Sequence, residues 1–234
     1  MTNITKSKKK DEKKDSFGNV ESALTRAEKF IETKQKLLLY VFGGILGVVL
    51  LVLMYIYMIK QPRQIDSYTY SYKAEEYFAI DSFNLALNGD GVNMGFLEII
   101  DEYGSTKMGN LSKYYAGVCY MRLGQFEDAI EMLESFSSKD NVIYPHSLAL
   151  LGDANVEIDN LKLALKYYLK AADKAQNEVS SPSYLMKAAN VCKLLGEYKQ
   201  AFDIYNKIDK EYHSYEQSNN LQIEKYIQEV KEKI

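Results

Sequence analysis

The chain contains few of the residues on which enzymes and metal sites depend. Its 234 residues include no tryptophan, two cysteines, three prolines and two histidines. His146 and His213 stand apart from any Cys or carboxylate pattern at metal-ligand spacing. The sequence also lacks a nucleophile paired with a base, a phosphate-binding glycine loop and paired catalytic carboxylates. We therefore expect no enzymatic activity, no metal and no cofactor.

Charge is missing from one long segment, residues 37–59, which forms 23 consecutive uncharged positions. A helix of this length rises roughly 35 Å, which exceeds the ~30 Å hydrocarbon core of a bilayer. Lys34 and Lys36 precede the segment, and Lys60 and Arg63 follow it. The segment is too long and too far from Met1 for a cleaved signal peptide. The sequence therefore predicts a single transmembrane helix in the lipid bilayer.

Positive charge is unevenly distributed around this segment. Residues 1–36 hold ten Lys and Arg against six acidic residues, whereas the rest of the chain holds 19 basic and 26 acidic residues. The rule that basic flanks stay inside predicts a cytoplasmic N-terminus and an extracytoplasmic C-terminal part. The acidity of that larger part argues against nucleic acid as a partner.

The segments before and within the predicted span suggest further contacts. Residues 1–16 are polar and lysine-rich, which predicts a disordered cytoplasmic tail that contacts solvent, anionic lipid or ribosomal RNA. Residues 17–36 carry apolar side chains at helical spacing and predict an amphipathic juxtamembrane helix. Gly43 and Gly47 form a Gly-x-x-x-Gly pair, which favours close packing with a partner helix.

Beyond the span, one pattern of small and apolar residues recurs three times without strand-like alternation. The copies are Ala116, Gly117, Tyr120, Leu123, Gly124, Phe126, Ala129 and Leu133; Leu151, Gly152, Asn155, Asp159, Leu161, Ala164, Tyr168 and Ala171; and Ala188, Ala189, Cys192, Leu195, Gly196, Tyr198, Ala201 and Tyr205. Ala129, Ala164 and Ala201 are 35 and 37 residues apart. Cys119 and Cys192 fall two repeats apart, too far for a disulfide, and are expected to pack in the core.

This pattern resembles the tetratricopeptide (TPR) repeat family, whose units are pairs of helices A and B with a period of 34 residues. The resemblance implies an all-α solenoid with three repeats over residues 111–213. Residues 60–110 are expected to form a linker and a degenerate first repeat, with one long helix over 65–87 and another from Phe96 to about Tyr103. Residues 214–234 are expected to form a capping helix with the stripe Ile223, Ile227, Val230 and Ile234.

In TPR proteins the A helices line a concave groove that accepts partner segments. Carrying those positions over gives a groove of mixed apolar, methionine and polar residues. They are Leu111, Tyr114, Val118, Met121 and Arg122 from the first repeat, His146, Ala149, Asp153 and Val156 from the second, and Met186, Asn190, Lys193 and Leu194 from the third.

The order of tail, span and repeats, with the juxtamembrane stretch 27–32, resembles the bacterial YfgM family. That resemblance implies a non-enzymatic subunit of the inner membrane with its repeats in the periplasm. Its implied partners are the Sec translocon, a PpiD-like chaperone and translocating polypeptides. Two alternatives stay open: an adaptor for envelope or cell-division assembly, and a mitochondrial import receptor, against which the basic tail argues.

Overall fold

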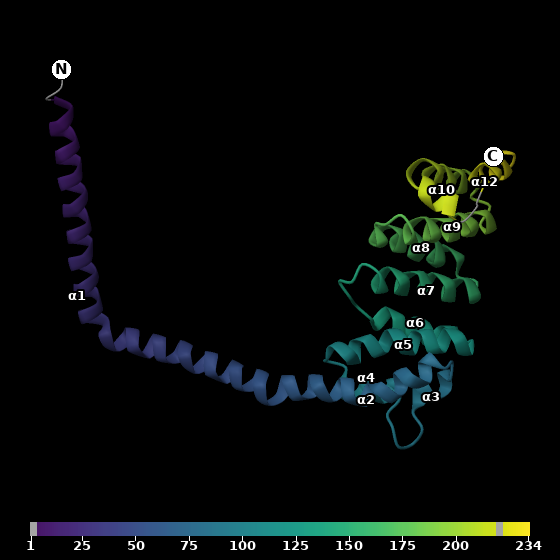
Figure 1. The fold of residues 1–234 in the computed structure, drawn as a ribbon, viewed down its shortest axis with the longest axis horizontal. Coiled ribbons are helices and arrows are strands. Elements are labelled where there is room, and N and C mark those ends of the chain that lie inside the picture. The colour runs from purple at the N-terminus through teal and green to yellow at the C-terminus, as the bar shows by residue number, and fades with distance from the viewer. Residues whose placement is uncertain (1–3, 219–221) are drawn as a thin grey trace. The chain divides into compact units, whose positions relative to one another are not determined.

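The computed structural model describes residues 4–218 and 222–234, and every regular element within them is helical (Figure 1). The chain divides into two compact units, Met1–Gln61 and Pro62–Ile234. The all-α fold expected from the sequence is confirmed.

The first unit is dominated by α1, Ile4–Tyr55, whose apolar part has no protein packed around it. Leu39 and Leu51 are each 68% exposed. This part of the chain is long and apolar enough to cross a membrane. The helix also includes residues 4–16, where the sequence analysis expects disorder; lysine and glutamate have high helix propensity, which a reading based on polarity alone overlooks.

The helical hydrogen-bonding pattern changes at the end of the apolar segment. A π-helical turn, Ile56–Lys60, precedes α2, Gln61–Ala79. Pro62 lacks a backbone N–H and its ring crowds the preceding turn of a helix, so the regular ladder is disturbed here. The N–H of Gln61 instead bonds to the carbonyl of Ile56. Such a turn is a recognised cause of helix bending.

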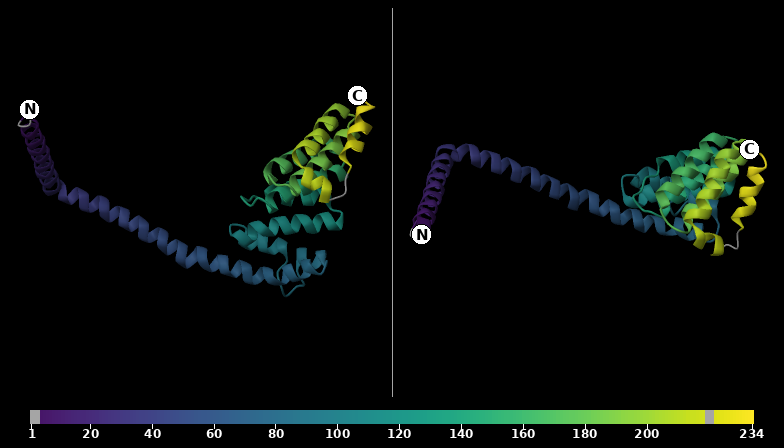
Figure 2. Two further views of the ribbon diagram at one scale, coloured as in Figure 1. Left: turned by 45° about the horizontal axis from the view of Figure 1, so that its top comes forward. Right: turned by 90° about the horizontal axis from the view of Figure 1, so that it is seen from above.

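The second unit stacks three pairs of helices, each with a helix A followed by a helix B (Figures 1 and 2). The pairs are α5 (Lys107–Leu123) and α6 (Phe126–Ser135), α7 (Ile143–Glu157) and α8 (Leu161–Ala175), and α9 (Ser180–Leu194) and α10 (Tyr198–Glu211). Ala129, Ala164 and Ala201 are all completely buried. The TPR-type repeat arrangement predicted from their spacing is therefore confirmed.

The same turn joins A to B in every pair. Gly124, Asp159 and Gly196 adopt left-handed backbone conformations. Two backbone bonds close each turn: Gly124 donates to Met121 and Gln125 to Tyr120, and the other two turns repeat this pattern. These are Schellman caps, which satisfy the last carbonyls of helix A.

A fourth copy of this turn lies at Asp81 and breaks the single helix expected over 65–87. Asp81 is left-handed, and Ser82 donates to the carbonyl of Tyr77. The expectation of one continuous helix is wrong, because aspartate can end a helix in the left-handed conformation much as glycine does. Phe83 and the buried Ala86 follow this turn at the same distances in sequence at which Phe126 and Ala129 follow the turn at Gly124. Thus α2 is the helix A of the degenerate repeat.

Helix B of this repeat is interrupted. It begins as α3, Phe83–Asn88, and residues 89–95 then form a loop before α4, Phe96–Tyr103. Phe96 is fully buried and its ring stacks on Tyr115 of α5, with centroids 5.0 Å apart. The start and end of α4 agree with the sequence expectation.

The C-terminal end is covered by α11, His213–Ser218, and α12, Ile223–Lys231. Ile223 and Val230 are completely buried, and α12 packs against α10. Ile234 lies beyond the helix and is 65% exposed, so the expected apolar stripe ends at Val230. Cys119 and Cys192 are both free and buried.

Candidate partner-binding groove

The groove residues expected from the sequence occupy equivalent positions on α5, α7 and α9. One position, at the same distance in sequence before the turn that ends each helix A, is occupied by Tyr114, Ala149 and Met186. A second such position is occupied by Val118, Asp153 and Asn190. Ala149 is buried, whereas His146 and Asn190 are exposed. Arg122 and Leu194 are exposed as well. The remaining groove residues are half-buried, and these are Leu111, Tyr114, Val118, Met121, Asp153, Val156, Met186 and Lys193.

Tyr114 and His146 meet across the first and second repeats. The Tyr114 hydroxyl and His146 Nδ1 are 2.8 Å apart and share a hydrogen bond, and the two rings lie edge to face. Burial raises the pKa of Tyr114 to about 12. Although His146 is exposed as a whole residue, its ring packs against Tyr114, and desolvation there lowers its pKa; the negative charge of Asp153 opposes this shift and the positive charge of Lys187 adds to it. The histidine is therefore held neutral near pH 7.

Asp153 joins the second repeat to the third. Lys187 Nζ of α9 lies 2.6 and 2.8 Å from the two carboxylate oxygens. The Tyr168 hydroxyl of α8 donates to the same carboxylate at 2.6 Å, and burial with this bond raises the pKa of Tyr168. Because the carboxylate has two internal donors, its first role is to fix the spacing of α7, α8 and α9.

A hollow of about 390 Å³ opens beside this network and contains the predicted residues His146, Ala149 and Asp153. The rest of its lining was not among the predicted residues and consists of Val179, Ser180, Ser183, Tyr184, Lys187 and Tyr215. Ser183 occupies the position in the third repeat that is equivalent to His146 in the second. Repeat equivalence could therefore have predicted it. Tyr215 comes from α11, outside the repeat pattern, and no sequence feature places it there.

Other predicted residues have partners away from this hollow. Lys193 forms an ion pair with Glu229 of α12 at 2.6 Å, and Asn190 accepts a hydrogen bond from the Tyr205 hydroxyl. The guanidinium of Arg122 lies 5.9 Å from the centre of the Phe83 ring. These three side chains hold neighbouring helices together, which the carried-over groove positions did not anticipate.

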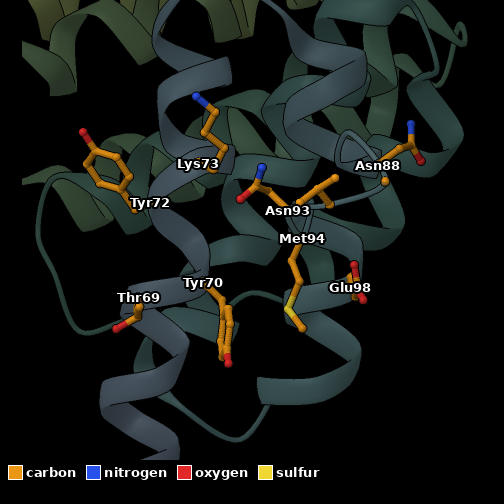
Figure 3. Close-up of a pocket in the computed structure, with 10 residues that line it drawn as sticks. Thr69, Tyr70, Tyr72, Lys73, Asn88, Asn93, Met94 and Glu98 are labelled. Carbon is orange, nitrogen blue, oxygen red and sulfur yellow. The ribbon is translucent and has the colours of Figure 1, made fainter.

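A second hollow, of about 380 Å³, lies between α2 and the loop of the interrupted helix B (Figure 3). Tyr70, Tyr72 and Lys73 come from α2, and Asn93 and Met94 come from the loop. The remaining lining residues are Thr69, Asn88, Gly91, Val92 and Glu98. Sequence analysis named none of these residues as a site.

The loop beside this second hollow is rigidly organised by Asp90. Its carboxylate accepts bonds from the backbone N–H groups of Val92 and Asn93, from the Asn93 amide and from the Tyr77 hydroxyl. These bonds hold the pKa of Asp90 well below its usual range. They also hold Val92 at the tip, where it is 91% exposed.

In the first unit, Gly43 and Gly47 have open space where a side chain would stand. A Cβ at either position would meet no atom of this chain within 4 Å. The surface on which a partner helix is predicted to pack is thus unobstructed.

Comparison with known proteins supports the fold. The sequence matches no protein-family model and no curated protein sequence. Two crystal structures of MamA align with TM-scores of 0.50, at 21% and 19% identity, covering 68% and 71% of this chain and 93% and 91% of theirs. TPR-like repeats of a putative kinesin light chain from Podosopora anserina align at 13% identity with a TM-score of 0.49, covering 70% of this chain and 92% of theirs. At these identities the likeness to MamA concerns the fold alone.

Proposed function

We propose that this protein is a membrane-anchored TPR adaptor that holds an extended protein segment in the groove of its A helices. The observation that carries this proposal is the hollow between α7 and α9, where His146, Ser183 and Tyr184 surround a space that the repeats do not fill. The mixture of aromatic, hydroxyl and charged side chains suits a peptide backbone with varied side chains. The apolar part of α1 supplies the anchor.

At a finer level, the adaptor acts at the exit side of the Sec translocon, together with a PpiD-like chaperone, on translocating polypeptides. Support comes from the order of basic tail, apolar span and acidic repeat domain, which resembles the YfgM family. In this proposal the tail is cytoplasmic and the repeats are periplasmic. Gly43 and Gly47 contact a partner helix within the bilayer.

Site-specific photocrosslinking tests the groove. A crosslinker at Ser183 or Tyr114 should capture a protein segment, whereas one at Lys166, exposed on helix B of the same solenoid, should not. Equal capture from Lys166 and Ser183 would show that the groove has no special role.

Purification in mild detergent tests the finer proposal. Gly43→Leu/Gly47→Leu should reduce recovery of the translocon or its chaperone, because the larger side chains prevent close helix approach. Ser183→Trp should leave that recovery intact while reducing crosslinks from Tyr114. Recovery of envelope-assembly or cell-division proteins in place of the translocon would instead support the alternative adaptor, for which the same fold and anchor are suited.

A further inference from the structure

Helix α2 buries its small polar residues and exposes its large apolar ones. Ser67, Ser71 and Ala74 are completely buried. On another side of the helix, Ile65, Tyr68 and Tyr72 are 65%, 51% and 70% exposed. A helix on the surface of a water-soluble domain normally shows the reverse arrangement.

The two buried serines of α2 are hydrogen-bonded within the helix, whereas the buried Gln64 Nε2 has no hydrogen-bond partner among the described residues. The Ser67 hydroxyl donates to the carbonyl of Gln64, and the single proton of the Ser71 hydroxyl is shared between the carbonyl of Tyr68 and the Glu75 carboxylate. Ala74 belongs to the core cluster that includes Phe96. The packing of Ala74 and the hydrogen bond that Gln64 Oε1 accepts from the Lys107 N–H turn this side of α2 toward the core, and the exposed apolar face follows from that orientation.

The exposed face is also free of charge along its first three turns. Ile65, Tyr68 and Tyr72 have the i, i+3, i+7 spacing of one helix face, and Gln61 and Thr69 complete it. The first charges that the helical spacing brings to this face are Glu75 and Glu76, beyond Tyr72. Tyrosine with aliphatic neighbours is the composition enriched where a membrane protein meets the headgroup layer.

The length of the connecting chain keeps this face near the bilayer. Ile65 follows Ile59, the last residue of the apolar segment, by six residues, which span at most about 20 Å. Pro62 and the π-helical turn Ile56–Lys60 supply a bending point at the start of α2. The exposed tip residue Val92 lines the same hollow as Tyr72 and adds a second exposed apolar side chain there.

We infer that the face formed by Ile65, Tyr68 and Tyr72 lies in the lipid headgroup region of the bilayer that this chain spans. This inference rests on the membrane anchoring in the proposed function. Lipid is favoured over a protein partner because the face begins within two turns of the span and carries no charge that would select a protein. The contact would hold the first repeat, and with it one end of the groove, at the membrane surface.

The absence of tryptophan from the chain makes a direct test feasible. Single-tryptophan variants of the full-length protein, Tyr68→Trp and Tyr72→Trp, are placed in nanodiscs with or without brominated phosphatidylcholine. Bromine quenches tryptophan only on contact. Both variants should lose emission in brominated nanodiscs, and their emission should be blue-shifted relative to Val142→Trp, a control that is 64% exposed on the repeats. Adding Ile65→Glu to Tyr72→Trp should reduce the quenching.

A second control, Leu50→Trp, separates this inference from the anchor itself. If Leu50→Trp is quenched and Tyr72→Trp is quenched no more than Val142→Trp, the anchor stands and the lipid contact of α2 is wrong. If Leu50→Trp is not quenched, membrane anchoring fails and the inference fails with it. A blue shift of Tyr72→Trp without bromine quenching would mean that protein covers this face, which also overturns the lipid contact.

Discussion

Close contact between helices A and B depends on single positions with almost no side chain. A Cβ added at Gly117 would lie 2.5 Å from Leu133 Cγ, and one added at Gly152 would lie 2.5 Å from Tyr168 Cε1. Leu133 can change rotamer, whereas Tyr168 is tied by its hydroxyl to Asp153. The two glycines therefore differ in how much substitution they tolerate.

Gly152→Ala should lower the free energy of unfolding by about 1–3 kcal/mol, since Tyr168 must shift and strain its bond to Asp153. Gly117→Ala should cost less. Urea titration of the purified repeat domain, monitored by helical circular dichroism, measures both. A larger loss at Gly117 would contradict the role assigned to Tyr168.

The depressed pKa of His146 predicts a pH dependence of stability. Below about pH 6.5 the unfolded chain takes up a proton at this histidine before the folded one does. Stability from this group is therefore present above that pH and is lost as pH falls through the lower folded-state pKa. His146→Gln should flatten the decline in melting temperature on acidification relative to the unsubstituted protein. Equal slopes in the two proteins would refute this assignment.

At the scale of elements, the sequence predicts the helix pairs well because alanine and glycine mark their crossings. Ala129, Ala164 and Ala201 establish the register of α6, α8 and α10. Phe83 and Ala86 mark the corresponding crossing in the degenerate repeat. The insertion at 89–95 lengthens that repeat, so the repeat period does not reveal them. The turn at Asp81 was not predicted, because an aspartate in the left-handed conformation is harder to recognise from the sequence than a glycine.

The site was less predictable than the fold, for a related reason. Repeat equivalence places His146 and Asp153 on the groove side, but it does not reveal which side chains are already paired. Lys193 is bound by Glu229 and Asp153 by Lys187, through contacts between elements distant in sequence. Single-sequence periodicity contains no information about such pairs.

The capping helix α12 should contribute stability chiefly through its buried aliphatic side chains. Ile223→Ala removes a fully buried side chain and should cost about 2–5 kcal/mol. Ile234→Ala, at an exposed position of the same segment, should change stability by less than ~0.5 kcal/mol. Thermal unfolding of the two variants measures the difference, and equal effects would mean that α12 does not cap the solenoid.

At the scale of the whole molecule, the distribution of charge predicts orientation. With a cytoplasmic N-terminus, protease added to intact spheroplasts should digest the repeats and leave a fragment that ends near Gln61. An epitope at the N-terminus identifies that fragment. Repeats that survive until the membrane is permeabilised would place them in the cytoplasm and exclude a role at the translocon exit.

The interrupted helix B of the first repeat has a consequence for the order in which the chain acquires structure. Synthesis delivers α2, α3 and α4 before α5, yet Phe96 and Ala74 share a core cluster with Ala116 and Cys119 of α5. Until α5 follows, the nascent first repeat has an incomplete core. The repeat nearest the span is thus the first to be made, but it must wait for its successor before it can fold.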